Sequence, residues 1–173
     1  MRPEDNLGGT TNQSVLIFPA MTPRVSNKKI NFLFSVNQVE DILRQAPVRP
    51  VPFSPPFVEG IAWWQDAVVP VMSLEACLGM ETAGPKRTQR LMVVRSAVTN
   101  SSGGTRLRSM LRVDSAIRML PLPSETISVT DDGWLPKKCL VRGIYEWERE
   151  ILVVPYLEKL LSGSIEIEIQ KNL

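Results

Sequence analysis

Short apolar runs separated by proline, glycine and polar residues dominate the chain, and they predict a protein built mainly of β-strands. The runs lie at 14–18, 30–36, 58–64, 67–72, 90–98, 110–113 and 117–122. Two other stretches place their apolar residues on one helical face, and they predict short helices at 74–79 and 157–161. The first two runs are expected to pair as a hairpin, as are 90–98 and 110–113 around a polar, glycine-rich tip.

The element after the second predicted strand is ambiguous. Val39, Ile42 and Leu43 suit one helical turn and a bulged strand equally well. Glu40 either fixes this element in place through a hydrogen bond or contacts a partner, and the sequence favours neither. The next stretch, 47–56, holds five prolines and is expected to run extended as a rigid connector. Its PxxP spacing is also that of a ligand for another protein's aromatic groove, and the connector is the favoured interpretation.

One phrase occurs twice in the chain. Val58-Glu59-Gly60-Ile61-Ala62-Trp63-Trp64 leads into Val68-Val69-Pro70, and Val141-Arg142-Gly143-Ile144-Tyr145-Glu146-Trp147 leads into Val153-Val154-Pro155. A repeated strand-turn-strand unit predicts two similar β lobes in one body. A flexible tail is expected at 1–13, a single domain of two intertwined lobes at 14–165, and a second tail at 166–173 that adds an edge strand or frays.

The repeat assigns structural roles to its shared residues. Glycines at equivalent places are expected at a bulge or a close approach of two strands, prolines at strand edges, and the second tryptophan of each copy in a lobe core. These residues are Gly60, Gly143, Pro70, Pro155, Trp64 and Trp147. Trp63 points to the opposite face of its strand and is the strongest candidate for an exposed contact with a partner.

Composition narrows the function. The chain has 20 basic and 18 acidic residues and no histidine, so the commonest general base and metal ligand is missing. Cys77 and Cys139 are too far apart in the sequence to suggest a metal site, and Cys77 is expected to be a small buried hydrophobe. Neither catalysis nor a cofactor is indicated. With no apolar run of about 20 residues, the chain is expected to be cytoplasmic without inserting into a membrane.

A group of arginines carries the nucleic-acid alternative. Arg106, Arg108 and Arg112 form a basic patch that is either a solvated face or a phosphate contact, and a small β-barrel protein that binds nucleic acid would use them with Arg87 and Arg90. The nearly even charge balance weighs against this alternative.

The residues also resemble a known family, the CheW-like adaptor domain of bacterial chemotaxis. Its pattern contains V-x-E-I-L, similar to Val39–Leu43 here, and later V-x-G-I-x-N-L-R-G-x-V-V-P-V-x-x-L-x-x-x-L-G. The second pattern is matched by Val58–Ile61, Val68–Val71, Leu74 and Leu78-Gly79. The chain departs from it at N-L-R-G, where Trp63-Trp64-Gln65-Asp66 loses a cation and a turn glycine.

The resemblance implies a mostly β fold, in which two SH3-like five-stranded β-barrels pack on a shared core with one to three short helices. It implies a noncatalytic scaffold without a cofactor that couples the cytoplasmic tip of a chemoreceptor to the regulatory domain of a chemotaxis histidine kinase. A pilus-motility pathway is an alternative setting. The candidate partner-binding residues are Trp63, Gln65, Asp66, Glu40 and Ile42.

Overall fold

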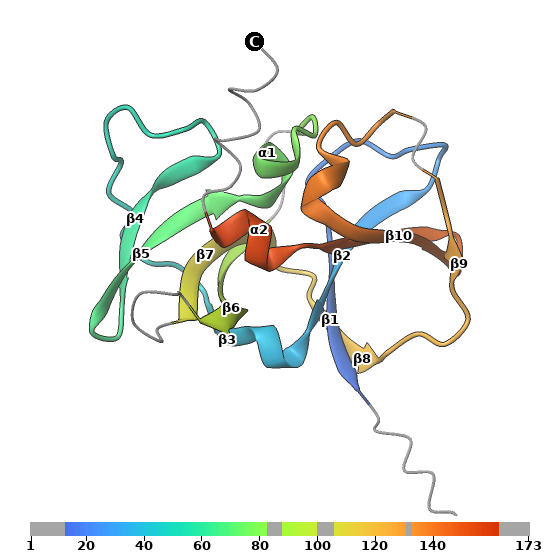
Figure 1. Cartoon of the computed structure of the whole chain (residues 1–173), viewed down its shortest axis with the longest axis horizontal. Helices are drawn as coiled ribbons and strands as arrows, with labels where there is room; N and C mark the ends of the chain where they lie inside the picture. Colours follow the sequence, from blue (N-terminus) through green and yellow to red (C-terminus); the bar gives the residue numbers. More distant parts are fainter. Residues whose placement is uncertain (1–12, 83–87, 100–105, 131–132, 163–173) are drawn as a thin grey trace, which may run out of the picture.

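The computed structural model describes residues 13–82, 88–99, 106–130 and 133–162, which form two sheets and two short helices (Figure 1). The six-stranded sheet contains β1 (Ser14–Pro19), β2 (Lys29–Ser35), β8 (Arg118–Pro121), β9 (Ile127–Ser128), β10 (Val141–Trp147) and β11 (Glu150–Pro155). The five-stranded sheet contains β3 (Val39–Leu43), β4 (Val58–Trp64), β5 (Ala67–Ser73), β6 (Gln89–Thr99) and β7 (Arg106–Asp114). The helices are α1 (Leu74–Leu78) and α2 (Leu157–Leu161).

The expected mostly β fold with short helices is confirmed. One sheet has six strands and not five, because the two-residue strand β9 adds to β10 at its edge. Almost all of the two predicted tails and of the tip after β6 lies outside the described residues.

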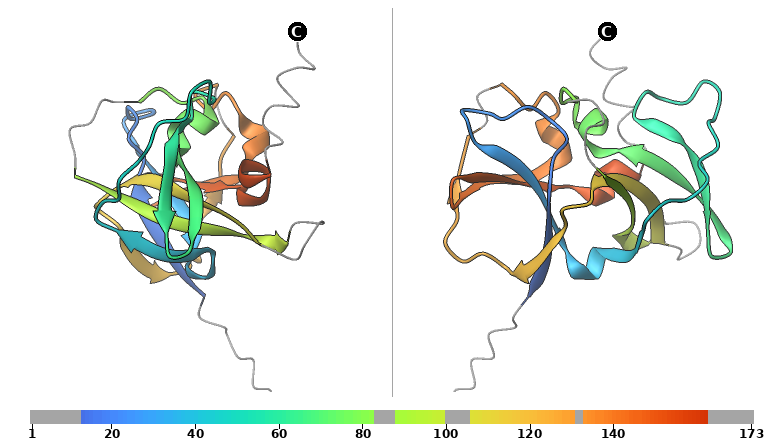
Figure 2. Two further views of the ribbon diagram at one scale, coloured as in Figure 1. Left: turned by 90° about the vertical axis from the view of Figure 1, so that its left-hand side faces the viewer. Right: turned by 180° about the vertical axis from the view of Figure 1, so that it is seen from behind.

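The two sheets share one strand order. The five-stranded sheet runs β3-β6-β7-β5-β4, and the other runs β8-β1-β2-β11-β10 before β9. Each sheet has one parallel pair, which joins its repeated hairpin to a second hairpin. In the five-stranded sheet β5 pairs with β7, and in the six-stranded sheet β11 pairs with β2. We call the five-stranded sheet the first lobe and the six-stranded sheet the second lobe; they lie side by side (Figure 2). Because β1 and β2 begin the second lobe and β8 to β11 complete it, the chain builds the first lobe in between.

The repeated glycines lie at register shifts. The β4–β5 pairing shifts between Val58 and Gly60, and the β10–β11 pairing shifts between Val141 and Gly143. A Cβ atom on Gly60 would lie 2.3 Å from the backbone oxygen of Arg49, whose segment pairs with Ile61 along the outer edge of β4. At Gly143 a Cβ atom would meet the Tyr145 hydroxyl at 2.6 Å. Each bulge therefore has a neighbour in the place that a Cβ atom would take, which is backbone at Gly60 and a side-chain end at Gly143.

The ambiguous element is a bulged strand. A 3₁₀ turn at Val36–Gln38 precedes it, with a reciprocal capping box between Ser35 and Gln38. Strand β3 then pairs with β6, and its register shifts between Val39 and Asp41, which leaves Glu40 as the extra residue. The helical alternative fails because the turn ends at the cap, where Val39 adopts extended backbone angles.

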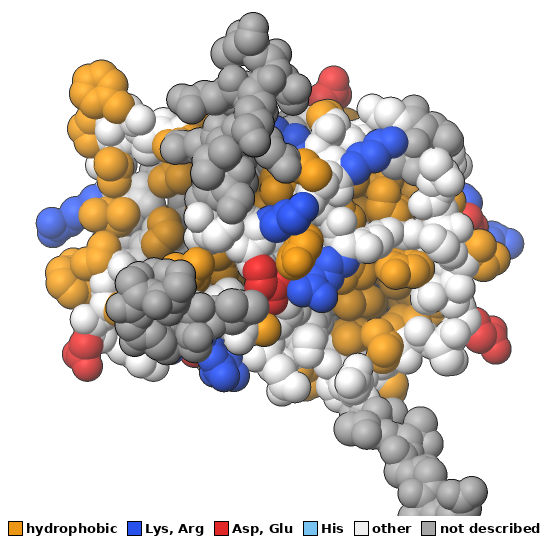
Figure 3. All heavy atoms as spheres, viewed as in Figure 1, with side chains coloured by type: hydrophobic (Ala, Val, Ile, Leu, Met, Phe, Trp, Pro, Cys, Tyr) orange, Lys and Arg blue, Asp and Glu red, His pale blue; other side chains and the backbone are white. Residues whose placement is uncertain are grey.

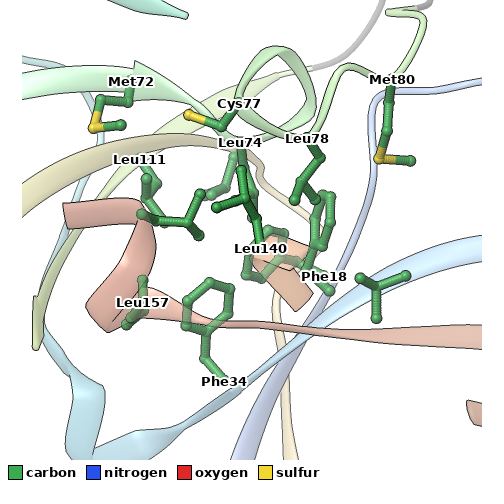
Figure 4. Close-up of a cluster of buried hydrophobic side chains, with 14 of the residues drawn as sticks. Phe18, Phe34, Met72, Leu74, Cys77, Leu78, Met80, Leu111, Leu140 and Leu157 are labelled. Atoms are coloured by element: carbon green, nitrogen blue, oxygen red, sulfur yellow. The ribbon is translucent and has the colours of Figure 1, made fainter. Parts of the chain in front are cut away.

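A shared core joins the lobes. Side chains from both sheets and both helices meet in one cluster, which includes Phe18, Phe34, Met72, Leu74, Leu111 and Leu157 (Figure 4). Cys77 lies in this cluster with none of its surface exposed, as expected for a small hydrophobe. Helix α1 begins at the Ser73 cap and ends at Gly79 in a left-handed conformation, so it stays short enough to fit between the lobes.

The proline-rich segment turns instead of running extended throughout. The Ser54 amide donates to the Val51 carbonyl, and Phe53 between them has a φ of 60°. A left-handed residue interrupts a polyproline helix, so this segment does not present a continuous PxxP ligand. Pro70 also differs from its expected place at a strand edge, because it lies within the interior strand β5 opposite Ile61. It is tolerated because the pairing of β5 with β7 starts only at Val71.

Candidate functional site

The outer face of the β4–β5 hairpin is apolar. Trp63 lies directly opposite Val68, and Ile61 lies opposite Pro70. Residues on the alternate positions, Ala62 and Val69, point into the first-lobe core and are buried. Trp63 is 65% exposed and Val68 is 47% exposed. We call Ile61, Trp63, Val68 and Pro70 the hairpin face. Strands β4 and β5 lie at the left of the view in Figure 1, and Figure 3 shows hydrophobic side chains along that side.

The hairpin ends in a tight turn without glycine. Gln65 has a φ of 51°, so it and not Asp66 takes the left-handed position. Both side chains are exposed at the tip, where the carboxylate of Asp66 is available to a partner.

A side-chain hydrogen bond closes the first lobe. Strands β3 and β4 are the two edges of the five-stranded sheet, and Nε1 of Trp64 donates to Oδ2 of Asp41 over 3.1 Å. Ile42, 39% exposed, follows Asp41 in the chain, and Trp63 precedes Trp64. The structure thus brings the candidates from both strands to one seam, with exposed Ile42 and Trp63 next to the two residues that form the bond.

The extra residues of the bulges in β3, β4 and β10 each carry a charge and form an ion pair. Glu40 Oε2 lies 2.6 Å from Nε of Arg108, and Oε1 accepts from Nη2 at 3.2 Å. At the equivalent bulges of the two hairpins, Glu59 pairs with Arg112 and Arg142 pairs with Glu158. A bulge re-aims the side chain of the extra residue. Of the two roles left open for Glu40, the hydrogen-bonded one is present in the structure.

These pairs change the interpretation of the basic patch. Arg108 and Arg112 share a strand face with Met110, which is a core residue of the first lobe. Arg108 also lies 5.8 Å from the ring centre of Trp64, in the range of a cation–π contact. Because carboxylates already bind both guanidinium groups, they do not form the open basic surface that the nucleic-acid alternative requires. Arg106 is exposed, as that alternative expected, and Arg87 lies outside the described residues.

The buried ionisable groups serve the fold. Glu75 is 2% exposed, and burial raises the pKa of its carboxyl despite a 2.8 Å hydrogen bond from the Met21 amide. Burial raises the pKa of the Cys77 thiol to about 12, which leaves it protonated and unreactive. Within the described ranges, His, Cys, Asp and Glu nowhere gather in threes that could hold a metal ion. Neither helix there has the length and apolar character needed to cross a bilayer.

Comparison with known proteins decides the family. The model of the CheW-like domain matches residues 20–164. The chain belongs to the CheW-like domain family. A curated relative, the probable chemotaxis protein CheW of Rhizobium etli, is 27% identical over 134 residues, which are 77% of this chain and 81% of that protein. The expected family is thereby confirmed, and with it the assignment of this CheW-like chain as a noncatalytic chemotaxis scaffold.

A solved structure carries the same fold. The crystal structure of the scaffolding protein TtCheW from Thermoanaerobacter tengcongensis superposes with a TM-score of 0.65 at 16% identity, over 91% of this chain and 93% of that one. The CheW-like fold is therefore retained although few residues are shared.

Sequence reasoning missed two members of the site and one exposed residue outside it. Val68 could have been found by pairing it with Trp63 across the two-residue turn. Asp41 lies beside the predicted residue Glu40, but only the tertiary structure shows that it reaches Trp64. Phe53 is the most exposed large hydrophobic residue of the described chain. Apart from the prolines around it, nothing in the sequence marks it as exposed.

Proposed function

We propose that this CheW-like protein joins the cytoplasmic tip of a chemoreceptor to the regulatory domain of a chemotaxis histidine kinase in the cytoplasm. The hairpin face is the docking site for the kinase domain. The observation that carries this proposal is the directly paired, exposed couple of Trp63 and Val68 on a rigid hairpin. An exposed indole next to an aliphatic side chain is the composition of an interface anchor.

The receptor docks at the neighbouring seam. A receptor tip is a helical coiled coil, and a helix docks by laying apolar side chains against an apolar surface of its partner. Ile42 on the edge strand β3 supplies the exposed apolar group, and the Asp41–Trp64 bond holds that strand in place. The two docking sites are adjacent. A change in how the receptor packs against β3 is therefore transmitted to the hairpin by the Asp41–Trp64 hydrogen bond, and no group-transfer reaction is needed.

The second lobe exposes a large apolar residue on each of its two edge strands. Met119 on β8 is 68% exposed and Ile127 on β9 is 71% exposed. These strands are the two edges of the six-stranded sheet. A scaffold that holds partners at both lobes can link them into an extended assembly, because each end binds a different molecule.

Binding to purified partners tests the proposal. The receptor cytoplasmic fragment and the kinase regulatory domain encoded by the same genome are titrated with this chain by isothermal calorimetry. We expect both to bind, and Trp63→Ser to weaken kinase binding at least tenfold because it removes a hot-spot side chain.

Trp63→Phe is the matched control. It keeps an aromatic ring on the hairpin face and is expected to lose less affinity than Trp63→Ser. Absence of binding to both wild-type partners would refute the scaffold role, and unchanged kinase binding by Trp63→Ser would remove the hairpin face from it.

A further inference from the structure

Phe53 occupies a backbone position that disfavours it. It is the third residue of the turn Val51–Ser54, in which Pro52 fixes the second residue and the Ser54 amide closes the turn on Val51. With a φ of 60° at Phe53, this geometry is that of a type II turn, in which the third position favours glycine. A bulky side chain in the left-handed region is strained by its own Cβ atom.

The folded chain gains nothing from the ring. Phe53 is 106% exposed relative to a reference residue, so its phenyl group has no packing partner within the described residues. In an isolated protein such a ring carries the cost of backbone strain and returns no free energy of burial. Such outliers concentrate at functional positions, where the surroundings hold them.

The surroundings of Phe53 are rigid. Pro50, Pro52, Pro55 and Pro56 restrict the loop, and Arg49 forms reciprocal backbone hydrogen bonds of 2.8 and 2.9 Å with Ile61 on β4. The Ser54 hydroxyl donates to the carbonyl of Val58. Ile61 belongs to the hairpin face, so the loop that carries Phe53 is attached directly to that surface.

The chain segment that carries the ring holds charges of one sign. From Ile42 to Val58 the sequence contains Arg44 and Arg49 and no acidic residue. Both arginines are exposed, and neither forms an ion pair within the part of the chain that the structure describes. A partner that receives Phe53 is therefore complementary when carboxylates surround its apolar pocket.

We infer that Phe53 is a preorganised knob that inserts into an apolar pocket with an acidic rim on the kinase regulatory domain that the hairpin face binds. The inference rests on the proposed function and adds a second anchor to it. Because the turn already holds the ring in its bound position, docking costs little conformational entropy.

A membrane is the weaker occupant. One phenyl ring with two arginines provides less than the acyl chain plus polybasic patch that stable attachment to a bilayer requires. The loop also continues into the hairpin face, and a partner of fixed shape contacts both.

The test replaces the ring and relieves the turn at the same time. Asn tolerates the left-handed region, so Phe53→Asn is expected to raise the midpoint of thermal unfolding by about 2 °C. The same variant is expected to bind the purified kinase regulatory domain at least tenfold more weakly than wild type. A variant that is more stable and binds less tightly cannot be explained by misfolding. Arg49→Gln is expected to slow association and to reduce its dependence on salt.

Ser26→Asn is the matched control. Ser26 is exposed in the second lobe with a φ of 47°, so the same new residue enters a left-handed position without removing a ring. It is expected to leave kinase binding unchanged. Phe53→Tyr keeps the ring and should retain the affinity within about threefold.

The outcomes separate this inference from the proposed function. If wild type fails to bind the kinase domain, the proposed function fails. If Trp63→Ser weakens binding and Phe53→Asn does not, the hairpin face stands and the knob is refuted. If wild type but not Phe53→Asn co-sediments with vesicles of one-third phosphatidylserine, the ring inserts into a membrane. This result would refute the inference that it enters a pocket of the kinase domain.

Discussion

The indole nitrogen of Trp64 and Oδ2 of Asp41, 3.1 Å apart, join the two edge strands of the first lobe. Strands β3 and β4 are the outermost members of a five-stranded sheet, and this bond connects them across the seam. The guanidinium of Arg108 lies over the same indole and is bound by Glu40, the neighbour of Asp41. Side chains thus connect β3 to β4, the two edge strands that the backbone hydrogen bonds of the sheet do not pair with each other.

Removal of the seam bond should destabilise the fold. Trp64→Phe keeps the ring and deletes the donor, and because the acceptor is charged we expect a loss of about 1–2 kcal/mol in the free energy of unfolding. Urea unfolding of Trp64→Phe, Asp41→Ala and the double variant should give a coupling energy of about 1 kcal/mol. Trp63→Phe, on the exposed side, should change stability by less than about 0.5 kcal/mol. Strictly additive losses would mean that the bond contributes nothing.

The two repeated glycines should differ in their tolerance of alanine. At Gly60 the added Cβ atom would meet the Arg49 backbone, which is itself paired with β4, so Gly60→Ala should cost about 3 kcal/mol. At Gly143 it would meet the end of the Tyr145 side chain, which can move, so we expect about 1 kcal/mol. Urea unfolding measures both. In a Tyr145→Leu background the penalty at Gly143 should largely disappear, whereas an equal penalty there would place the clash elsewhere.

The carboxyl of Glu75 should make stability depend on pH. Burial raises its pKa in the folded protein above the ordinary value of 4.5, so the folded state keeps a proton that the unfolded chain releases. The stabilising contribution is complete below pH 4.5 and is lost as the pH rises through the raised pKa.

Glu75→Gln removes this titration and retains an oxygen that accepts from the Met21 amide. The unfolding midpoint of this variant, relative to wild type, should rise between pH 4 and neutrality. Glu81→Gln at an exposed position is the control and should follow wild type. A constant difference across the range would contradict the assignment.

The two thiols should react at very different rates. Cys139 is exposed, while Cys77 is buried and burial raises its pKa to about 12. With Ellman's reagent at pH 8 one thiol per folded chain should react rapidly, and the second only after denaturation. Cys139→Ser should abolish the rapid phase. A rapid phase that survives in this variant would mean that the shared core opens readily at α1.

The sequence alone predicted the architecture, because each strand shows a local alternating pattern and the hairpin unit occurs twice. Alternation marked the strands, and the shared spacing of Gly60 with Gly143 and of Trp64 with Trp147 predicted two similar lobes. The short β9 was missed because a strand of two residues has too few positions to show alternation. The bulge at Glu40 was one of two possibilities, because a local pattern of apolar residues does not distinguish a turn from a kinked strand.

Tertiary structure decided which side chains are available to partners. Trp63 and Trp64 are adjacent in the chain, and the sequence already placed them on opposite faces, but only the fold shows that Trp64 bonds to Asp41 and that Trp63 is paired with Val68. The arginines of β7 looked like a free basic patch, yet two of them are neutralised by carboxylates brought from other strands. Phe53 became distinctive only through its backbone angle and exposure. Local pattern fixes the elements, because it depends on near neighbours; ion pairs, seams and solvent exposure depend on residues far apart in sequence, which only folding brings together.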